Sequence, residues 1–202
     1  MEILVTDTTD FAQHWKDYNS RLKVSLEKVP SDGIAEVAAV LRQARSNRKT
    51  IFFAGNGGSA ATANHFACDL MKNTVDKDLP RYRCMSLSSS NTAITAYAND
   101  EGYETAFVEP MKAFFDEGDI LLAVSASGNS PNIVAAAEYV LNHRGVVIGL
   151  SGFSGGKLKE LANCSLHVPS DEYEVVEDAH SILLHALVCY AKRHTADRIA
   201  AQ

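Results

Sequence analysis

The sequence lacks long hydrophobic runs, and no segment approaches the ~18 consecutive apolar residues that a membrane-spanning helix needs. The first seven residues also lack the basic and apolar sections of a secretory signal. Basic residues are outnumbered, since 19 Lys and Arg face 25 Asp and Glu. The net charge of −6 argues against a surface built to attract nucleic acid or anionic lipid. We therefore expect a cytoplasmic protein without membrane or nucleic-acid partners.

Cysteine is scarce, and none of its four copies belongs to a Cys-x-x-Cys pair. All four lie in apolar surroundings, a pattern typical of small buried side chains in a reducing compartment. This pattern predicts buried free thiols and no disulfide bonds. The residues concerned are Cys68, Cys84, Cys164 and Cys189.

The composition is that of an ordinary globular protein, with 202 residues of which 46% are hydrophobic and 22% charged. No internal repeat, low-complexity stretch or linker divides the chain. We expect one domain over residues 1–202 with a helical extension over about residues 8–45. Within that extension, apolar residues recur at helical spacing over residues 11–26 and 34–44. Ser31 or Asp32 is expected to cap the second of these helices.

From residue 50 onward, short apolar runs alternate with segments of helical spacing. The apolar runs predict strands at residues 51–54, 85–87, 120–124, 146–150 and 166–168. The other segments predict helices at residues 60–71, 90–97, 106–115, 132–141, 156–161 and 176–192. Because strands and helices alternate throughout, we expect an α/β fold, a three-layer sandwich around a five-stranded parallel sheet.

Two turns that follow predicted strands carry residues suited to binding an anion. The first turn, residues 55–59, reads Gly-Asn-Gly-Gly-Ser and leads into a helix whose N-terminal amides can hold a negative charge. The second turn, residues 125–131, reads Ser-Ala-Ser-Gly-Asn-Ser-Pro, in which Pro131 suits the first helical position and Ser130 its cap. Capping accounts for Ser130 but not for Ser125 and Ser127, so the two turns together indicate a phosphate site. A structural turn without a ligand is the alternative for the first turn taken alone.

Two predicted helices carry histidine and carboxylate side chains at spacings that place them on one face. His65 and Asp69 are four residues apart, and Glu177 and His185 are eight apart, about two turns. On facing helices, these four side chains could form a tetrahedral site for a divalent metal ion, and the nitrogen ligands suit zinc. The same spacing is found in ordinary surface pairs, so the spacing alone leaves both interpretations open.

Taken together, the two turns, His65, Asn99 with Asp100, and the helix from Glu177 to His185 resemble the sugar isomerase (SIS) fold. The resemblance covers nearly the whole chain. It is closest to the phosphoheptose isomerase family, which interconverts sedoheptulose 7-phosphate and D-glycero-D-manno-heptose 7-phosphate. The resemblance implies a flavodoxin-like sheet, a metal-assisted aldose-ketose isomerase that works through an enediol, and one zinc ion per subunit. It also implies a homotetramer whose sites are completed by neighbouring chains.

The resemblance also implies roles for individual residues. Asp69 would take the first proton and His185 would shuttle the second. The family's zinc positions fall at His65, Asp69, Glu177 and His185. Its substrate-binding positions fall at Asn56, Gly57, Gly58, Ser59, Asn99, Asp100, Ser125, Ala126, Ser127, Ser130 and Glu177. Among these, the four serines would hold the phosphate, and Asn56, Gly57, Asn99 and Asp100 would contact the sugar.

Three positions depart from the family pattern. Asp69 stands where the family usually has Glu, and the shorter side chain places the base ~1.5 Å further back. Glu177 stands where the family usually has Gln, and a second carboxylate lowers the net charge of a zinc site from about +1 to about 0. Asn73 stands where the family usually has arginine. These changes leave open an isomerase of a different phosphosugar.

Two further functions compete with a metal-assisted isomerase. One is a non-catalytic phosphosugar-binding or regulatory protein of the same fold, such as the relatives that bind the replication initiator. The other is a nucleotide-binding α/β protein. The chain lacks Gly-x-x-x-x-Gly-Lys-Ser/Thr and the full Gly-x-Gly-x-x-Gly, which weighs against nucleoside triphosphates and dinucleotides.

Overall fold

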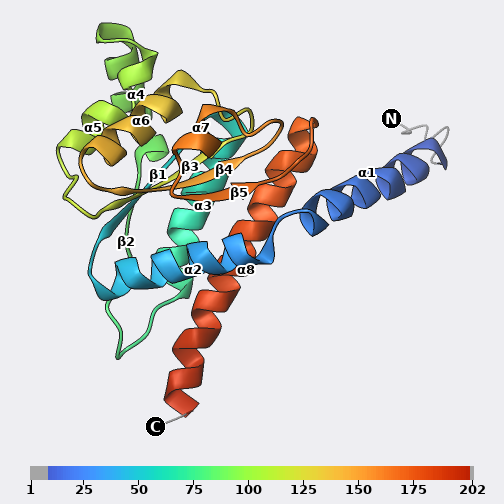
Figure 1. Cartoon of the computed structure of the whole chain (residues 1–202), viewed down its shortest axis with the longest axis horizontal. Coiled ribbons are helices and arrows are strands. Elements are labelled where there is room, and N and C mark those ends of the chain that lie inside the picture. Colours follow the sequence, from blue (N-terminus) through green and yellow to red (C-terminus); the bar gives the residue numbers. More distant parts are fainter. Residues whose placement is uncertain (1–8, 201–202) are drawn as a thin grey trace, which may run out of the picture.

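The computed structural model describes residues 9–200, with side chains described for residues 10–193, and shows a sheet between layers of helices (Figure 1). The strands are all parallel and lie in the order β2-β1-β3-β4-β5. The predicted α/β fold with a five-stranded parallel sheet is confirmed. The strands are β1 (Thr50–Gly55), β2 (Arg83–Ser86), β3 (Ile120–Ser125), β4 (Val146–Ser151) and β5 (Cys164–His167).

Most helices lie within a few residues of their predicted bounds. The predicted helix over residues 106–115 is wrong in extent, because the chain forms a short 3₁₀ helix and then only the five-residue α5. The second strand ends earlier than predicted, because Leu87 begins another 3₁₀ helix. The helices are α1 (Thr9–Glu27), α2 (Ser31–Ser46), α3 (Gly57–Asn73), η1 (Leu87–Ser89), α4 (Asn91–Asp100), η2 (Tyr103–Thr105), α5 (Val108–Lys112), α6 (Pro131–Asn142), α7 (Gly156–Leu161) and α8 (Tyr173–Ala200).

The start of α2 corrects the predicted cap. Pro30, not Ser31 or Asp32, occupies the cap position, and its side chain makes no capping hydrogen bond. Pro30 has an extended backbone, with φ −63° and ψ 127°, and the chain enters the helix directly at Ser31. Asp32 therefore lies inside the first turn, where its charge faces the positive end of the helix dipole.

Alternate side chains of the strands fill two cores, one on each face of the sheet. Phe53 and Leu122 pack on one face with residues of α2, α3 and α8. Phe52 and Leu121 pack on the other face with residues of α5, α6 and α7. All four side chains are fully buried, which explains why the strands read as continuous apolar runs in the sequence. Helices α3 and α6 consequently lie on opposite faces of the sheet.

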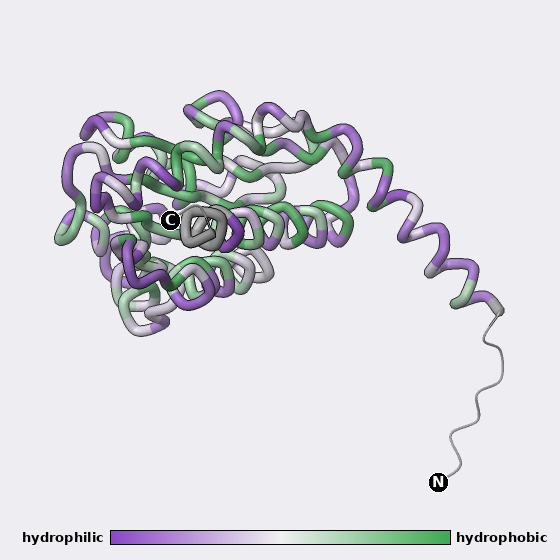
Figure 2. Tube along the Cα trace, turned by 90° about the horizontal axis from the view of Figure 1, so that it is seen from below, coloured by the Kyte–Doolittle hydropathy of each residue, from purple (hydrophilic) through white to green (hydrophobic). Residues whose placement is uncertain are grey.

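Helix α1 extends away from the body of the molecule (Figures 1 and 2). It is held near the start of α8, where Tyr18 Oη donates to Asp178 Oδ2 at 2.6 Å and Arg21 pairs with Glu172 at 2.9 Å. Further out, Phe11 and Trp15 are 69% and 55% exposed. This helix therefore presents large apolar side chains to solvent instead of to the core of its own chain.

Within the described residues, no helix combines the length and the apolar character that crossing a membrane requires. Residues 1–7, on which the expectation about a secretory signal rests, lie outside the described residues.

The four cysteines carry free thiols. Cys164 is buried and Cys84 is half-buried, but Cys68 and Cys189 are exposed. The prediction of buried thiols is wrong for these two, because they lie on the outward faces of α3 and α8.

His180 of α8 is fully buried beside the end of β4. Its Nε2 atom lies 3.2 Å from the carbonyl oxygen of Ser151, and its Nδ1 atom has no hydrogen-bond partner in the part of the chain that is described. Burial disfavours the charged imidazolium and lowers the pKa of His180 from 6.5 to about 4. The ring is therefore neutral in the folded protein at neutral pH.

We expect His180 to make the free energy of unfolding fall as the pH drops. Because the unfolded chain takes up this proton near pH 6.5 and the folded chain only near pH 4, the contribution is present above pH 6.5 and is lost between these values. Between pH 7 and pH 4.5 the loss is about 2 kcal/mol. Urea unfolding at both pH values, with His180→Leu for comparison, measures it. Equal pH dependence in the two proteins would contradict a neutral, buried His180.

Candidate functional site

The two turns lie at one edge of the sheet because β1 and β3 are neighbours. The strand order reverses between them, with β2 beyond β1 on one side and β4 beyond β3 on the other. In open parallel sheets, the crevice at such a reversal is where ligands bind. The register pairs Gly55 with Val124, so both turns begin at the same level. Helices α3 and α6 start within or directly after these turns, and their N-terminal amides lie at this edge.

A pair of asparagines joins the first turn to the start of α6, directly after the second turn. Asn56 Nδ2 donates to Asn132 Oδ1, and Asn132 Nδ2 donates to Asn56 Oδ1, each at 2.9 Å. Asn132 is fully buried, and its Oδ1 atom also accepts from the amide of Ile133 at 3.0 Å. The hydroxyl of Tyr103, from η2, donates to Asn56 Oδ1 at 2.8 Å. Two residues that the sequence analysis missed, Asn132 and Tyr103, thus fix the side chain of Asn56.

The second turn carries three serine side chains, two of which lie side by side. Ser125 Oγ lies 3.3 Å from Ser130 Oγ, and Ser127 Oγ accepts from the amide of Asn129 at 3.2 Å. Ser130 and Pro131 occupy the predicted cap and first positions of α6, but Ser130 makes no capping hydrogen bond. Its hydroxyl lies beside Ser125 instead, so the predicted capping role of this side chain is wrong. The turn therefore brings hydroxyl groups together at the start of a helix.

The backbone of the second turn rests on the turn that follows β4. Gly152 N–H donates to the carbonyl of Ala126 at 2.7 Å, and Leu158 N–H donates to the carbonyl of Gly128 at 2.9 Å. Ala126 itself is buried. Gly128 has a φ of +67°, and a methyl group there would collide with the carbonyl oxygen of Gly155. A glycine at position 128 is therefore required for the two turns to touch.

The residues of the first turn differ in their exposure to solvent. Gly57 and Gly58 are exposed, whereas Ser59 is buried in the first turn of α3. The absence of a side chain at Gly58 makes room for Glu177, because a methyl group there would lie 2.6 Å from Glu177 Oε2. The Glu177 carboxylate thus lies at the N-terminal end of α3, where the helix dipole favours a negative charge.

Asn99 and Asp100 lie at the exposed end of α4. Asn99 Nδ2 donates to Asp100 Oδ1 at 2.7 Å, so among the described residues these two bond with each other and not with either turn. Their predicted contact with the sugar stays a prediction. Tyr103, three residues further on, is the residue of this segment that reaches Asn56.

Three of the four predicted metal ligands come together on facing helices. His65 and Asp69 of α3 and His185 of α8 each offer a ligand atom, and these atoms all lie within 4.8 Å of one another. Asp69 Oδ2 is 3.5 Å from His65 Nε2 and 3.8 Å from His185 Nε2. The two imidazole rings meet edge to face, with centroids 4.9 Å apart. Two imidazoles and one carboxylate match the three protein ligands of many catalytic zinc sites, so these residues fit a divalent metal ion.

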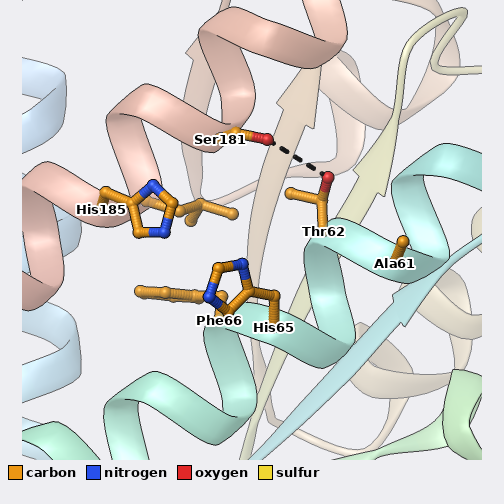
Figure 3. A pocket seen from close by; sticks show the side chains of 7 residues that line it. Ala61, Thr62, His65, Phe66, Ser181 and His185 are labelled. Atoms are coloured by element: carbon orange, nitrogen blue, oxygen red, sulfur yellow. Dashed lines mark hydrogen bonds between the residues drawn. The ribbon is translucent and has the colours of Figure 1, made fainter.

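The histidines border a pocket between α3 and α8 (Figure 3). The pocket has a volume of about 180 Å³, and the hydroxyls of Thr62 and Ser181 lie 3.4 Å apart across it. The side chains of His65 and His185 are 60% and 52% exposed, whereas that of Asp69 is 18% exposed. The cluster is therefore open to solvent on the side of the histidines and covered at the carboxylate.

Glu177 does not join this cluster. Eight residues separate it from His185, which is about 12 Å along a helix, and its carboxylate lies against Gly58. In place of the expected set of four, the fold brings together His65, Asp69 and His185.

Comparison with known proteins finds similarity to the SIS domain family and to phosphoheptose isomerases. Residues 14–152 match the SIS domain family. The chain is 34% identical to the phosphoheptose isomerase of Helicobacter pylori (strain P12) over 181 residues, which cover 90% of this chain and 93% of that protein. The fold is similar to phosphoheptose isomerase GmhA from Neisseria gonorrhoeae, with a TM-score of 0.82, 29% identity and coverage of 91% and 97% of the two chains. It is also similar to a phosphoheptose isomerase from Francisella tularensis, with a TM-score of 0.84, 27% identity and coverage of 93% and 100%.

We expect the side chains of Asn56 and Asn132 to be energetically coupled. Either single substitution by Ala leaves the Nδ2 group of the partner amide without its acceptor and lowers the free energy of unfolding by about 1–3 kcal/mol. The double substitution removes both amides, so its loss should be smaller than the sum of the single losses by about 1 kcal/mol. Urea unfolding of the four proteins measures this difference. Strictly additive losses would show that the two amides do not interact.

Proposed function

This chain belongs to the phosphoheptose isomerase family of SIS-domain proteins and is a phosphosugar isomerase, and from this premise we propose that it interconverts sedoheptulose 7-phosphate and D-glycero-D-manno-heptose 7-phosphate. The observation that carries the proposal is the cluster of His65, Asp69 and His185. Aldose-ketose isomerisation requires groups that move protons beside a carbonyl, and this cluster gathers such groups beside an open pocket that its two histidines line.

The second turn is the proposed phosphate site. It contains no lysine or arginine, so the hydroxyls of Ser125, Ser127 and Ser130 and the N-terminal amides of α6 would hold the phosphate, with Ser59 as a fourth hydroxyl. The Glu177 carboxylate at the start of α3 makes the second turn the more favourable of the two for a dianion. The first turn would then contact sugar hydroxyls, chiefly through Asn56 and the backbone at Gly57.

His65, Asp69 and His185 are the proposed ligands of one zinc ion per subunit. Three protein ligands with an open position are typical of catalytic zinc, so this set does not require Glu177. When bound, the ion would supply Lewis-acid polarisation of the substrate carbonyl.

Asp69 and His185 are the proposed catalytic residues. From the ketose, the Asp69 carboxylate takes a proton from C1, and the C–H electron pair forms the C1–C2 double bond of an enediolate. His185 moves the proton of the C1 hydroxyl to the oxygen on C2. The proton held by Asp69 then returns to C2, so the carbonyl moves from C2 to C1 without a net gain or loss of atoms.

A homotetramer with sites shared between neighbouring chains is the proposed assembly. Two observations support it. Helix α1 holds Phe11 and Trp15 exposed beyond the body of the molecule, and the histidines of the cluster are more than half exposed. A second copy packed against these regions would bury the aromatic side chains and cover the open pocket.

We expect zinc-loaded protein to convert sedoheptulose 7-phosphate in deuterated water to the aldose, with deuterium at C2 from exchange of the abstracted proton. NMR of the reaction mixture detects both changes. His185→Ala should lose this turnover and keep phosphate binding. His143→Ala, at an exposed histidine that ends α6, is the matched control and should keep both. If folded, zinc-replete protein binds the sugar phosphate but gives neither product nor deuterium, this result would contradict an isomerase that acts on this substrate and would favour the phosphosugar-binding alternative.

We expect Ser127→Ala to weaken binding of the substrate phosphate. A hydrogen bond to a charged group contributes about 1.5–3 kcal/mol, which corresponds to a roughly 10- to 100-fold higher dissociation constant. Calorimetric titration with sedoheptulose 7-phosphate measures it, and Ser46→Ala, at an exposed serine that ends α2, is the control. An unchanged dissociation constant would remove Ser127 from the phosphate site.

A further inference from the structure

Both carboxylate oxygens of Asp69 have neighbours that define their roles. Asn73 Nδ2 donates to Asp69 Oδ1 at 2.9 Å. The other oxygen, Oδ2, is the one that lies 3.5 Å from His65 Nε2 and 3.8 Å from His185 Nε2. The hydrogen bond from Asn73 therefore leaves Oδ2 as the oxygen that faces the two histidines.

The chemistry of the pair sets its orientation. An ionised carboxylate only accepts hydrogen bonds, so the amide nitrogen of Asn73 must be the group that faces it. The last torsion of an aspartate side chain is otherwise broad and nearly two-fold, and a donor on one oxygen restricts it. Because the amide is neutral, it orients the carboxylate without cancelling the negative charge that a metal ion or a proton needs.

Hydrogen bonds of the next residue, Thr74, hold the backbone at Asn73 in place. Asn73 is the last residue of α3, and the buried Thr74 follows it as the C-terminal cap. Thr74 Oγ1 donates to the carbonyl of Leu70 at 2.5 Å, and the carbonyl of Thr74 accepts from Arg45 Nη2 at 3.0 Å. The end of α3 is thereby tied to α2, so Asn73 acts on Asp69 from a fixed position.

We propose that Asn73 is a positioning residue of the cluster. It holds Asp69 so that Oδ2 is presented toward His65 and His185, where a divalent ion would bind and where the proton is moved. This inference rests on the metal-assisted reaction proposed above, and it assigns a role to a residue that touches neither ion nor substrate.

Cobalt(II) binding to the full-length protein tests the proposal, because its visible absorption reports the ligands of the ion. Asn73→Leu keeps the approximate shape of the side chain and removes the donor, and leucine favours helix formation more than asparagine does. We expect a roughly 10- to 100-fold higher dissociation constant for Co²⁺ and an altered absorption spectrum. Asn73→Gln, which keeps the amide, should recover part of the affinity. Asn142→Leu makes the same change at the last residue of α6, which is exposed, and should have no effect.

The thermal unfolding midpoint of each metal-free protein checks that the variants fold, and Asn73→Ala provides a second variant without the donor. Turnover should fall because kcat falls, with little change in KM, since the proposed phosphate site is formed by the second turn and not by the cluster on α3 and α8. Unchanged Co²⁺ affinity and spectrum in Asn73→Leu and Asn73→Ala would overturn the role of Asn73 and leave the metal site standing. Absence of Co²⁺ binding in the unsubstituted protein would instead overturn the metal site, and the role of Asn73 with it.

Discussion

The parallel pairing of β1 with β3 is the constraint on which the site depends. Side chains alternate along these strands, so Phe52 and Phe53 bury themselves on opposite faces of the sheet and hold α6 and α3 on those faces. The sheet therefore separates the two helical layers, and the two turns lie beyond the carboxyl ends of its strands. There the reciprocal hydrogen bonds of Asn56 and Asn132 link the first turn to the start of α6, which follows the second turn. The arrangement of the two turns is thus a product of the sheet order and of one pair of amides.

Features that depend on local interactions could be predicted from the sequence. Buried strands and the turns after them follow from apolar runs that end in Gly or Ser, so the sheet and the places of both turns could be predicted. Tyr103 could not be predicted, because its bond to Asn56 joins residues 47 apart. The one available indication for Asn132 was an amide between Pro131 and the apolar Ile133. The hydroxyl of Ser130 could not be placed either, because Ser125, across the turn, competes with the helix for it.

The contact of α3 with α8 decides which predicted ligands meet. Helical spacing correctly predicted that His65 and Asp69 share one face of α3. Spacing along α8 cannot predict which of its residues lies opposite Asp69, because that depends on where the two helices cross. In the structure, His185 of α8 lies beside Asp69, whereas Glu177 of α8 lies beside Gly58 at the start of α3. With neutral imidazoles, His65, Asp69 and His185 carry one negative charge, so a divalent ion there would keep a net charge of about +1. The net charge of about 0 expected for a site with two carboxylates therefore does not apply to this set of three.

The contact between the second turn and the glycines after β4 bears on the proposed phosphate site. A methyl group at Gly156 would lie 2.5 Å from the carbonyl oxygen of Ser127, just as one at Gly128 would collide with Gly155. Two backbones in direct contact leave the turn little freedom, so its backbone is held in place before any ligand arrives. Such preorganisation reduces the conformational entropy that binding would otherwise cost. Affinity at the proposed phosphate site would consequently depend on two positions that have no side chain at all.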